Sequence, residues 1–279
     1  MTNKRILTIQ DISCVGQCSM TVALPIVSAC GVETGILPSA VLSTHTGGFS
    51  GYTVRDLSAD FLPIAAHWQK EGIKFDAVYT GYLGTEEMID HVDFIMENLL
   101  ADGGLRIVDP AMADNGKLYY GFDDAYAKKM AWLCSKADII MPNITEACFM
   151  TDTEYKTDYD EIYVLALLKK LGDMGCKTIV LTGVCYSSDN FGVGVYDCAS
   201  GKIEYYFHRR ISRSYHGTGD CYASAFVGSL MRGHEILKSA SIAADFVLAA
   251  IEKTVGDDDH WYGVKFEQAL PQLIEAINK

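Results

Sequence analysis

Short runs of apolar residues alternate along the chain with longer segments in which apolar residues recur at helical spacing. Continuous apolar runs are typical of buried strands, and the helical repeat is typical of amphipathic helices. The predicted strands cover residues 4–10, 76–83, 106–110, 137–143 and 177–183. The predicted helices cover residues 20–31, 86–104, 123–135, 144–151 and 159–174. This alternation predicts an α/β fold with three layers, in which helices cover both faces of a largely parallel sheet.

The last third of the chain departs from this alternation. Residues 191–197 and 202–208 alternate as two antiparallel strands do, with a short turn between them. Three further helices are predicted over residues 218–232, 235–255 and 264–278. Neither an internal repeat nor a linker-like segment interrupts the pattern, so we expect one domain over residues 1–279.

The predicted parallel strands end in polar residues or glycine rather than in further apolar residues. In open parallel sheets, ligands bind beyond the carboxyl ends of the strands. The residues at these ends are Asp11, Tyr82, Asp109, Asn143, Thr182 and Gly183. We therefore expect them to face one binding crevice.

Composition narrows the function classes. The chain of 279 residues has a formal net charge of −13, and an acidic surface repels phosphate backbones, so no nucleic-acid partner is expected. No apolar run reaches the roughly 18 residues of a membrane span, so no membrane partner is expected. The nine cysteines form no C-x-x-C pair and the N-terminus lacks a signal-peptide pattern. These features predict a cytoplasmic protein with reduced thiols.

The stretch YHGTGDCYASAF, residues 215–226, places an acid at the start of a predicted apolar helix. Gly217, Thr218 and Gly219 let several N–H groups converge, and the helix dipole favours an anion there. Asp220 falls in the first helical turn, where a carboxylate can accept a proton from an attacking hydroxyl group. An ordinary capping role for Asp220 is the alternative. The P-loop and dinucleotide-binding patterns are both missing from the sequence.

Six motifs in order resemble those of one enzyme family. GTGD at the start of a C-terminal helix is similar to the signature of the ribokinase-like superfamily of small-molecule kinases. The others resemble the pyridoxal kinase branch: IQDISCVGQCS (9–19), STHTGGFSGY (43–52), TGYLG (80–84), VDPAMADNGKLY (108–119) and MPNITEA (141–147). The resemblance covers essentially the whole chain. It implies a ribokinase-like fold and ATP-dependent phosphorylation of the 5′-hydroxymethyl group of pyridoxal, pyridoxine or pyridoxamine.

The resemblance also implies roles on the phosphate side of the site. Gly217, Thr218 and Gly219 would form an anion hole for the γ-phosphoryl group, and Asp220 would be the general base. The chemistry of the glycine loop and the family resemblance therefore indicate the same anion-binding role for these residues.

The resemblance implies Mg²⁺ as the metal, with ATP as co-substrate. Asp109 would lie near the metal and the ATP phosphates, and Asn143 and Glu146 would hold Mg²⁺ directly or through water. Thr182 and Gly183 would contact phosphate. A monovalent cation is a further candidate cofactor. A capping box at a helix start is an alternative for Asn143 and Glu146, and both roles can coexist.

On the substrate side, Thr46 and Tyr82 match positions that line the pyridine pocket of the family, and Cys18 would form part of the opposite wall. One position departs from the pattern, because Asp11 stands where pyridoxal kinases commonly have serine. A carboxylate there would accept a hydrogen bond from a protonated ring nitrogen, a ring hydroxyl or an exocyclic amine. Hydroxymethylpyrimidine kinase is therefore an alternative function.

A third alternative for the function is a non-catalytic protein that binds vitamin B6 on the same scaffold. The complete set of acid and glycines around Asp220 argues against it, because a protein that only binds needs no base. By analogy with relatives, we expect a homodimer that acts on a small-molecule substrate.

Overall fold

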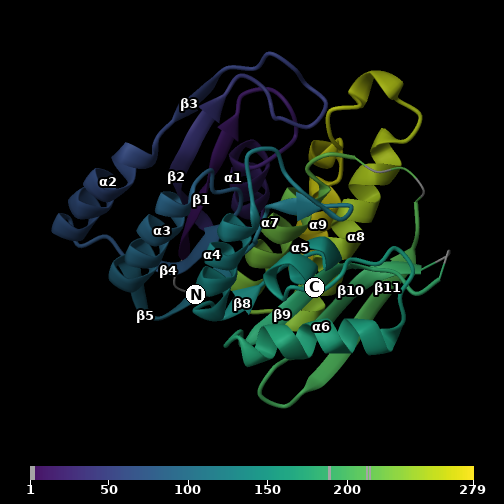
Figure 1. Ribbon diagram of the computed structural model, residues 1–279. Helices are drawn as coiled ribbons and strands as arrows, with labels where there is room; N and C mark the ends of the chain where they lie inside the picture. The colour runs from purple at the N-terminus through teal and green to yellow at the C-terminus, as the bar shows by residue number, and fades with distance from the viewer. Residues whose placement is uncertain (1–3, 188–189, 212, 214) are drawn as a thin grey trace.

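The computed structural model of the protein describes residues 4–187, 190–211, 213 and 215–279. Within these residues, nine strands form one sheet in the order β11-β10-β9-β8-β5-β4-β1-β2-β3, covered by helices on both faces (Figure 1). Five neighbouring pairs, from β9 through β8, β5, β4 and β1 to β2, run parallel. The two edges are antiparallel, β3 against β2 and β10 and β11 beside β9. This is the three-layer α/β architecture that the sequence predicts.

The strands of the sheet are β1 (Arg5–Ser13), β2 (Glu33–Leu42), β3 (Val54–Asp56), β4 (Phe75–Thr80), β5 (Leu100–Val108), β8 (Ile139–Ile140), β9 (Thr178–Val184), β10 (Asn190–Asp197) and β11 (Lys202–Arg209). A separate hairpin consists of β6 (Ala113–Asp114) and β7 (Lys117–Leu118). Asn115 and Gly116 form its turn with positive φ angles, which these two residue types adopt more readily than others.

The helices divide between the two faces according to the buried side that each carries. One face is covered by α2 (Ser58–Lys70), α3 (Glu86–Leu99), α4 (Asp124–Ser135), α5 (Ile144–Met150) and α6 (Glu161–Asp173). The other is covered by α1 (Met20–Ala29), α7 (Thr218–Met231), α8 (Ile236–Thr254) and α9 (Leu270–Ile277). Two hydrophobic cores result, one on each side of the sheet.

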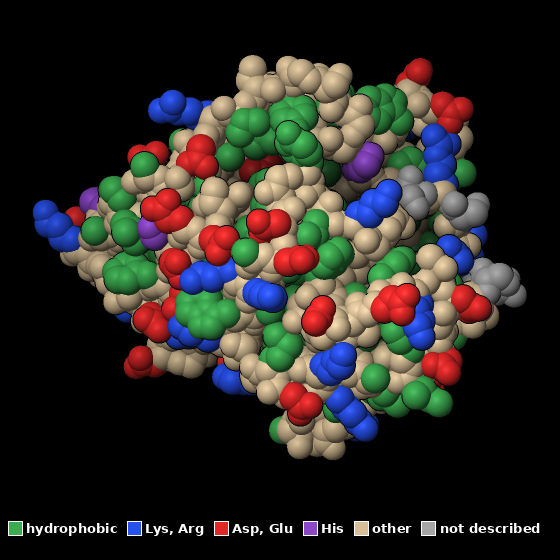
Figure 2. Space-filling model, viewed as in Figure 1, with side chains coloured by type: hydrophobic (Ala, Val, Ile, Leu, Met, Phe, Trp, Pro, Cys, Tyr) green, Lys and Arg blue, Asp and Glu red, His purple; other side chains and the backbone are tan. Residues whose placement is uncertain are grey.

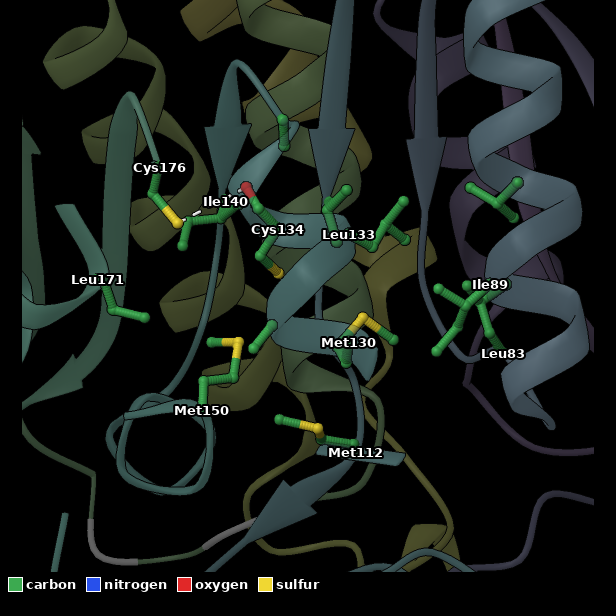
Figure 3. Close-up of a cluster of buried hydrophobic side chains, with 14 of the residues drawn as sticks. Leu83, Ile89, Met112, Met130, Leu133, Cys134, Ile140, Met150, Leu171 and Cys176 are labelled. Carbon is green, nitrogen blue, oxygen red and sulfur yellow. Dashed lines mark hydrogen bonds between the residues drawn. The ribbon is translucent and has the colours of Figure 1, made fainter. Parts of the chain in front are cut away.

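The first of these cores holds the segment that leads into the candidate site. Figure 3 shows side chains of α3, α4 and β8 converging there, with Ile89, Met130 and Ile140 among them. Met112, four residues after the end of β5, is fully buried in the same cluster. Packing of Met112 therefore fixes the path of the chain just beyond the strand end.

The molecular surface carries both positively and negatively charged side chains. Figure 2 shows acidic and basic side chains interspersed over one face. Lys129 of α4 pairs with Asp90 of α3 at 2.5 Å, and Lys136, which caps the end of α4, pairs with Asp93 at 2.5 Å and with Glu97 at 3.9 Å. Among the described helices, none is long and apolar enough to cross a membrane.

Three elements between residues 33 and 70 have no counterpart among the predicted segments. They are β2, β3 and α2. Pro38 lies inside β2 and Pro63 inside α2, and proline usually marks the end of a strand or helix. The two prolines therefore explain why β2 and α2 were not predicted from the hydrophobic pattern.

Two predicted helix boundaries were wrong. The helix predicted over 86–104 ends at Leu99, and β5 begins at the next residue, because Leu100 has an extended backbone. The helix predicted over 264–278 is divided into a 3₁₀ turn at Phe266–Gln268 and α9. Pro271 stands in the first turn of α9, where its missing N–H group is not needed.

Candidate active site

The carboxyl ends of the central strands lie side by side and continue to pair for a few residues beyond each strand. The Gly81 N–H donates to Ile9 O at 3.1 Å, and the Asp109 N–H donates to Thr80 O at 3.1 Å. Asn143 and Thr182 form an isolated parallel bridge. The structure therefore brings the ends of β1, β4, β5 and β9 to one edge of the sheet.

The glycine loop before α7 approaches another part of the backbone very closely. Gly217 is the N-cap of the helix and has φ +74°, and a Cβ atom there would lie 1.6 Å from Gln17 O. Gly219 faces open space. In the described part of the chain, the Gly219 and Asp220 N–H groups have no hydrogen-bond acceptor. Such N–H groups at a helix N-terminus suit an anion.

Asp220 is held from outside its own helix. Its Oδ2 accepts a hydrogen bond from the Ser19 N–H at 2.9 Å. Burial raises the pKa of Asp220 to about 6, against the lowering effect of the Ser19 N–H, and Asp11 raises it further. The carboxylate is thus largely ionised at neutral pH and still basic enough to accept a proton.

Asn143 and Glu146 form the capping box that was the alternative interpretation. Asn143 Oδ1 accepts from the Glu146 N–H at 2.9 Å, and Glu146 Oε2 accepts from the Asn143 N–H at 2.8 Å. Glu146 Oε1 also accepts from the Met112 N–H at 3.1 Å. Oε2 therefore caps α5, and Oε1 joins that helix to the segment after β5. Burial raises the pKa of Glu146 to about 8, although these N–H groups lower it.

Asp109 lies at the end of β5 with little solvent contact. Its side chain is buried, and in the described residues its carboxylate accepts no hydrogen bond. Burial raises the pKa of Asp109 well above its usual value, and the neighbouring Glu146 and Asp220 raise it further. Three carboxyl groups thus repel one another at this edge of the sheet, an arrangement that a cation would relieve.

The donor set at this edge fits Mg²⁺ but not a cage made by protein alone. Asp109 and Glu146 supply carboxylate oxygens, which Mg²⁺ prefers. No group of three or more acidic, histidine or cysteine side chains is arranged to hold an ion in the described residues. Mg²⁺ usually takes one or two carboxylates and completes its shell with water and substrate phosphates, so two suffice.

Two of the predicted substrate residues, Cys18 and Tyr82, are influenced by the charge of Asp11. Asp11 is buried at the end of β1, and Ser13 Oγ donates to its Oδ2 at 2.8 Å. Burial raises the pKa of Tyr82 to about 12, and Asp11 adds to the rise. Burial also raises the pKa of the half-buried Cys18 thiol, followed by the charges of Asp220 and Asp11. The charge of Asp11 therefore acts on Tyr82, Cys18 and Asp220 alike.

The remaining predicted residues are Thr46, Thr182 and Gly183. Thr46 is exposed on the loop after β2. Thr182 is half-buried, and its hydroxyl donates to Pro142 O at 3.4 Å. Gly183 has φ +75°, and its carbonyl oxygen accepts from the Tyr159 hydroxyl at 3.1 Å.

His45, to which the sequence assigned no role, joins the loop after β2 to the segment around Tyr262. Its Nδ1 accepts from the Gly47 N–H at 3.0 Å, so Nε2 carries the proton and donates to Tyr262 O at 2.8 Å. Phe49 lies edge-on to the His45 ring at 5.0 Å and tilted against Trp261 at 4.6 Å. His45 and Tyr262 are 217 positions apart in the sequence, and no local signal indicates such a contact.

Ser19 was also missed, although it contacts the candidate base directly. It lies within the motif over residues 9–19, but a backbone donor has no signature in side-chain chemistry.

The sequence between residues 24 and 263 matches the model of a family described as phosphomethylpyrimidine kinase. This chain belongs to the phosphomethylpyrimidine kinase family. Among curated relatives, it is 27% identical over 253 residues to the thiamine biosynthetic bifunctional enzyme of Arabidopsis thaliana. That match covers 87% of this chain and 47% of the relative, so this member of the family spans about half the length of the plant protein.

Crystal structures of two bacterial proteins are similar to this family member over nearly its whole length. A supposed phosphomethylpyrimidine kinase from Bacteroides thetaiotaomicron, in a crystal form with pyridoxal, has a TM-score of 0.92 and 34% identity, covering 98% of this chain and 96% of that one. Pyridoxal kinase from Lactobacillus plantarum has a TM-score of 0.89 and 32% identity, covering 99% and 98%. The resemblance to pyridoxal kinases and the ribokinase-like fold are confirmed.

Proposed function

We propose that this member of the kinase family transfers the γ-phosphoryl group of ATP to the 5′-hydroxymethyl group of a vitamin B6 compound, pyridoxal, pyridoxine or pyridoxamine. The observation that carries the proposal is Asp220, an oriented carboxylate with a pKa of about 6 beside N–H groups that lack acceptors in the described residues. The similarity to a pyridoxal kinase, and to a structure that contains pyridoxal, supports the choice of substrate. The proposed catalytic unit is one domain, acting as a homodimer.

In the proposed reaction, Asp220 Oδ1 accepts the proton of the substrate hydroxyl group while the oxygen of that hydroxyl group attacks the γ-phosphorus. The bond between that phosphorus and the oxygen bridging to ADP breaks as the new bond forms. The N–H groups of Gly217, Thr218 and Gly219 donate to the oxygens of the phosphoryl group in transit. Oδ2 stays bound to the Ser19 N–H, which keeps the carboxylate aimed at the substrate.

Mg²⁺ is the proposed metal, with Asp109 and Glu146 as the residues that hold it, directly or through water. When bound, the ion neutralises charge on the phosphates. Asn143 positions Glu146 through the capping box, and Thr182 and Gly183 are the proposed phosphate contacts at the end of β9. These assignments rest on the strand-end geometry described above.

A second candidate function is phosphorylation of hydroxymethylpyrimidine. The family description names a pyrimidine substrate, and the buried Asp11 supplies an acceptor that suits an exocyclic amine. The same carboxylate suits a protonated pyridine nitrogen. The two candidates therefore share the mechanism and differ in what Asp11 binds.

A substrate panel with MgATP tests the proposal. The panel contains pyridoxal, pyridoxine, pyridoxamine, hydroxymethylpyrimidine and ribose, and both ADP release and the phosphorylated product are measured. Turnover of a B6 compound that disappears in Asp220→Asn supports the proposal. Turnover of the pyrimidine alone supports the second candidate. Binding of B6 compounds without any turnover contradicts both and leaves a non-catalytic binding protein.

A further inference from the structure

The end of β9 carries a bulge at Gly183. Val184 pairs with Gly192 of β10, but the next β10 residue, Val193, pairs with Thr182, so in the described pairing Gly183 is an extra residue with no partner on β10. Its φ is +75°, in the left-handed region that the glycine of one common class of bulge adopts. A bulge bends its strand and redirects the groups at that point. The bulge therefore sets the direction of the backbone at the end of β9.

The Tyr159 hydroxyl spans this bulge. It donates to Gly183 O at 3.1 Å and accepts from the Cys185 N–H at 3.1 Å, so a single oxygen holds two backbone groups that lie two residues apart. Burial raises the pKa of Tyr159 to about 12, so the hydroxyl keeps the proton that it donates. Tyr159 lies 24 positions before Gly183, in the segment that leads into α6. The bulge is thus held from outside its own strand.

The bulge adjoins one of the proposed phosphate contacts and contains the other. Thr182, the residue before Gly183, is held on the side of β8, where its N–H donates to Pro142 O at 2.9 Å and it bridges to Asn143. On the side of β10, the pairing is interrupted at Gly183, and the Tyr159 hydroxyl binds the carbonyl oxygen of the same residue. The tyrosine therefore completes the support of a strand end whose other side is already paired.

The ring of Tyr159 makes contacts of its own. It lies tilted against Tyr163 with ring centres 5.7 Å apart, and edge-on to Tyr186 at 6.2 Å. These contacts pack the start of α6 against the sheet and do not need the hydroxyl. Replacement by phenylalanine therefore keeps the packing and removes only the two hydrogen bonds at the bulge.

We propose that Tyr159 is a positioning residue for the nucleotide, because its hydroxyl holds the bulge at Gly183 and thereby aims the end of β9 at the phosphates of ATP. Without that hydroxyl, Gly183 is free to leave its bulge angle, since glycine has many backbone conformations open to it. The ring substrate is expected to be unaffected, because Asp11 lies on β1, four strands away from β9 in the sheet. This inference rests on the proposed function for the identity of the nucleotide and for its contact with Thr182 and Gly183.

Steady-state kinetics separate this role from general support of the fold. Tyr159→Phe is expected to raise KM for ATP roughly tenfold, the effect of one misaligned hydrogen bond to a charged phosphate, and to leave KM for the ring substrate unchanged. The matched control is Tyr163→Phe, which removes a hydroxyl that donates to Glu154 O at 2.7 Å, away from the bulge. An unchanged KM for ATP in Tyr159→Phe overturns the proposal, and so does an equal rise in Tyr163→Phe.

A change in the bulge itself should have the same effect. Gly183→Ala is expected to raise KM for ATP, because alanine rarely adopts φ +75°, although the nearest atom to the added Cβ, on Phe191, is 3.9 Å away. Gly201→Ala is the control, with φ +69° and its nearest atom at 3.8 Å, in the turn between β10 and β11. Combining Tyr159→Phe with Gly183→Ala should raise KM for ATP no further than Gly183→Ala alone. A combined effect equal to the product of the two single effects would mean that the residues act independently, and would overturn the proposal.

Two measurements without turnover separate failure of this inference from failure of the proposed function. In the unliganded protein, Tyr159→Phe is expected to speed hydrogen exchange of the Cys185 amide about fivefold, because that amide loses its acceptor, whereas Tyr163→Phe leaves it unchanged. By calorimetry, Tyr159→Phe should weaken binding of MgADP about tenfold. If either quantity is unchanged in Tyr159→Phe, this inference is wrong even where the unaltered protein phosphorylates a B6 compound. If the unaltered protein binds no MgADP, the proposed function is wrong and the inference falls with it.

Discussion

Asn143 and Glu146 bind each other reciprocally, side chain to backbone in both directions, at 2.8 and 2.9 Å. The same Glu146 carboxylate accepts from the Met112 N–H, so one buried side chain joins α5 to the segment after β5. The proposed metal-binding role and a structural role therefore fall on one residue. They are separable only by measuring stability and activity together.

Glu146→Gln should destabilise the protein even without substrate. Glutamine has one acceptor oxygen, so the N–H of either Asn143 or Met112 loses its partner, at about 1–3 kcal/mol for each unsatisfied buried donor. Glu86→Gln, in the exposed first turn of α3, is the control and should change the free energy of unfolding by less than about 0.5 kcal/mol. Urea unfolding checks both. Equal stabilities of the two variants would show that the capping box contributes little.

Asp220→Asn should leave the fold intact and abolish most of the rate. An amide cannot accept the hydroxyl proton, and general-base catalysis contributes about 10²–10⁴-fold. Asp124→Asn makes the same change in the exposed first turn of α4 and should retain full kcat. Steady-state kinetics with MgATP is the measurement. A kcat for Asp220→Asn within a few-fold of the unaltered protein rules out Asp220 as the base.

The fold was largely predictable because the central strands are buried on both faces and are therefore continuous apolar runs. The same runs placed Asp109 and Asn143 at strand ends, and the structure has them there. What escaped prediction depends on contacts between distant segments. The Ser19 contact to Asp220 and the His45 contact to Tyr262 join residues 201 and 217 positions apart.

Local exceptions account for the other failures. Pro38 pairs with Gln10 inside the sheet, and the pairing shifts register just after it, so the strand tolerates a residue that usually ends one. The change from α3 to β5 has no intervening loop, because Leu99 is the last buried helical residue and Leu100 is already extended. Neither feature has a signal in hydrophobic spacing.

The activity should rise with pH through a midpoint near the pKa of Asp220, about 6. Below the midpoint the carboxyl group is protonated and cannot accept the substrate proton, so kcat/KM falls. Asp11 raises this pKa by charge repulsion, so Asp11→Asn should move the midpoint to lower pH. The measurement is kcat/KM between pH 5 and 8 at saturating MgATP. A midpoint that does not move in Asp11→Asn would contradict the electrostatic link.

Stability should fall as pH rises from mildly acidic to mildly alkaline. Burial raises the pKa of Glu146 from 4.5 to about 8, so the folded state binds the proton more tightly than the unfolded chain. The contribution of Glu146 to the free energy of unfolding is fully present below pH 4.5 and is lost as pH rises through about 8. Asp109 acts in the same direction. Urea unfolding at several pH values should show this slope, and Glu146→Gln should reduce it. A free energy of unfolding that rises with pH over this range would contradict the raised pKa values of Glu146 and Asp109.

Gly217→Ala should be far more damaging than the usual exchange of glycine for alanine. The added Cβ would lie 1.6 Å from Gln17 O, and φ is +74°, so both the loop and the helix start must move. Gly233→Ala is the matched control, because its φ is +95° but no atom lies within 4 Å of the added Cβ. Strain alone at Gly233 should cost on the order of 1 kcal/mol. Thermal unfolding and kcat should both fall much further in Gly217→Ala, because Gln17 lies only two residues from Ser19 and the clash also displaces the donor to Asp220. Equal effects of the two substitutions would mean that the loop between β1 and α1 yields easily and does not hold the base.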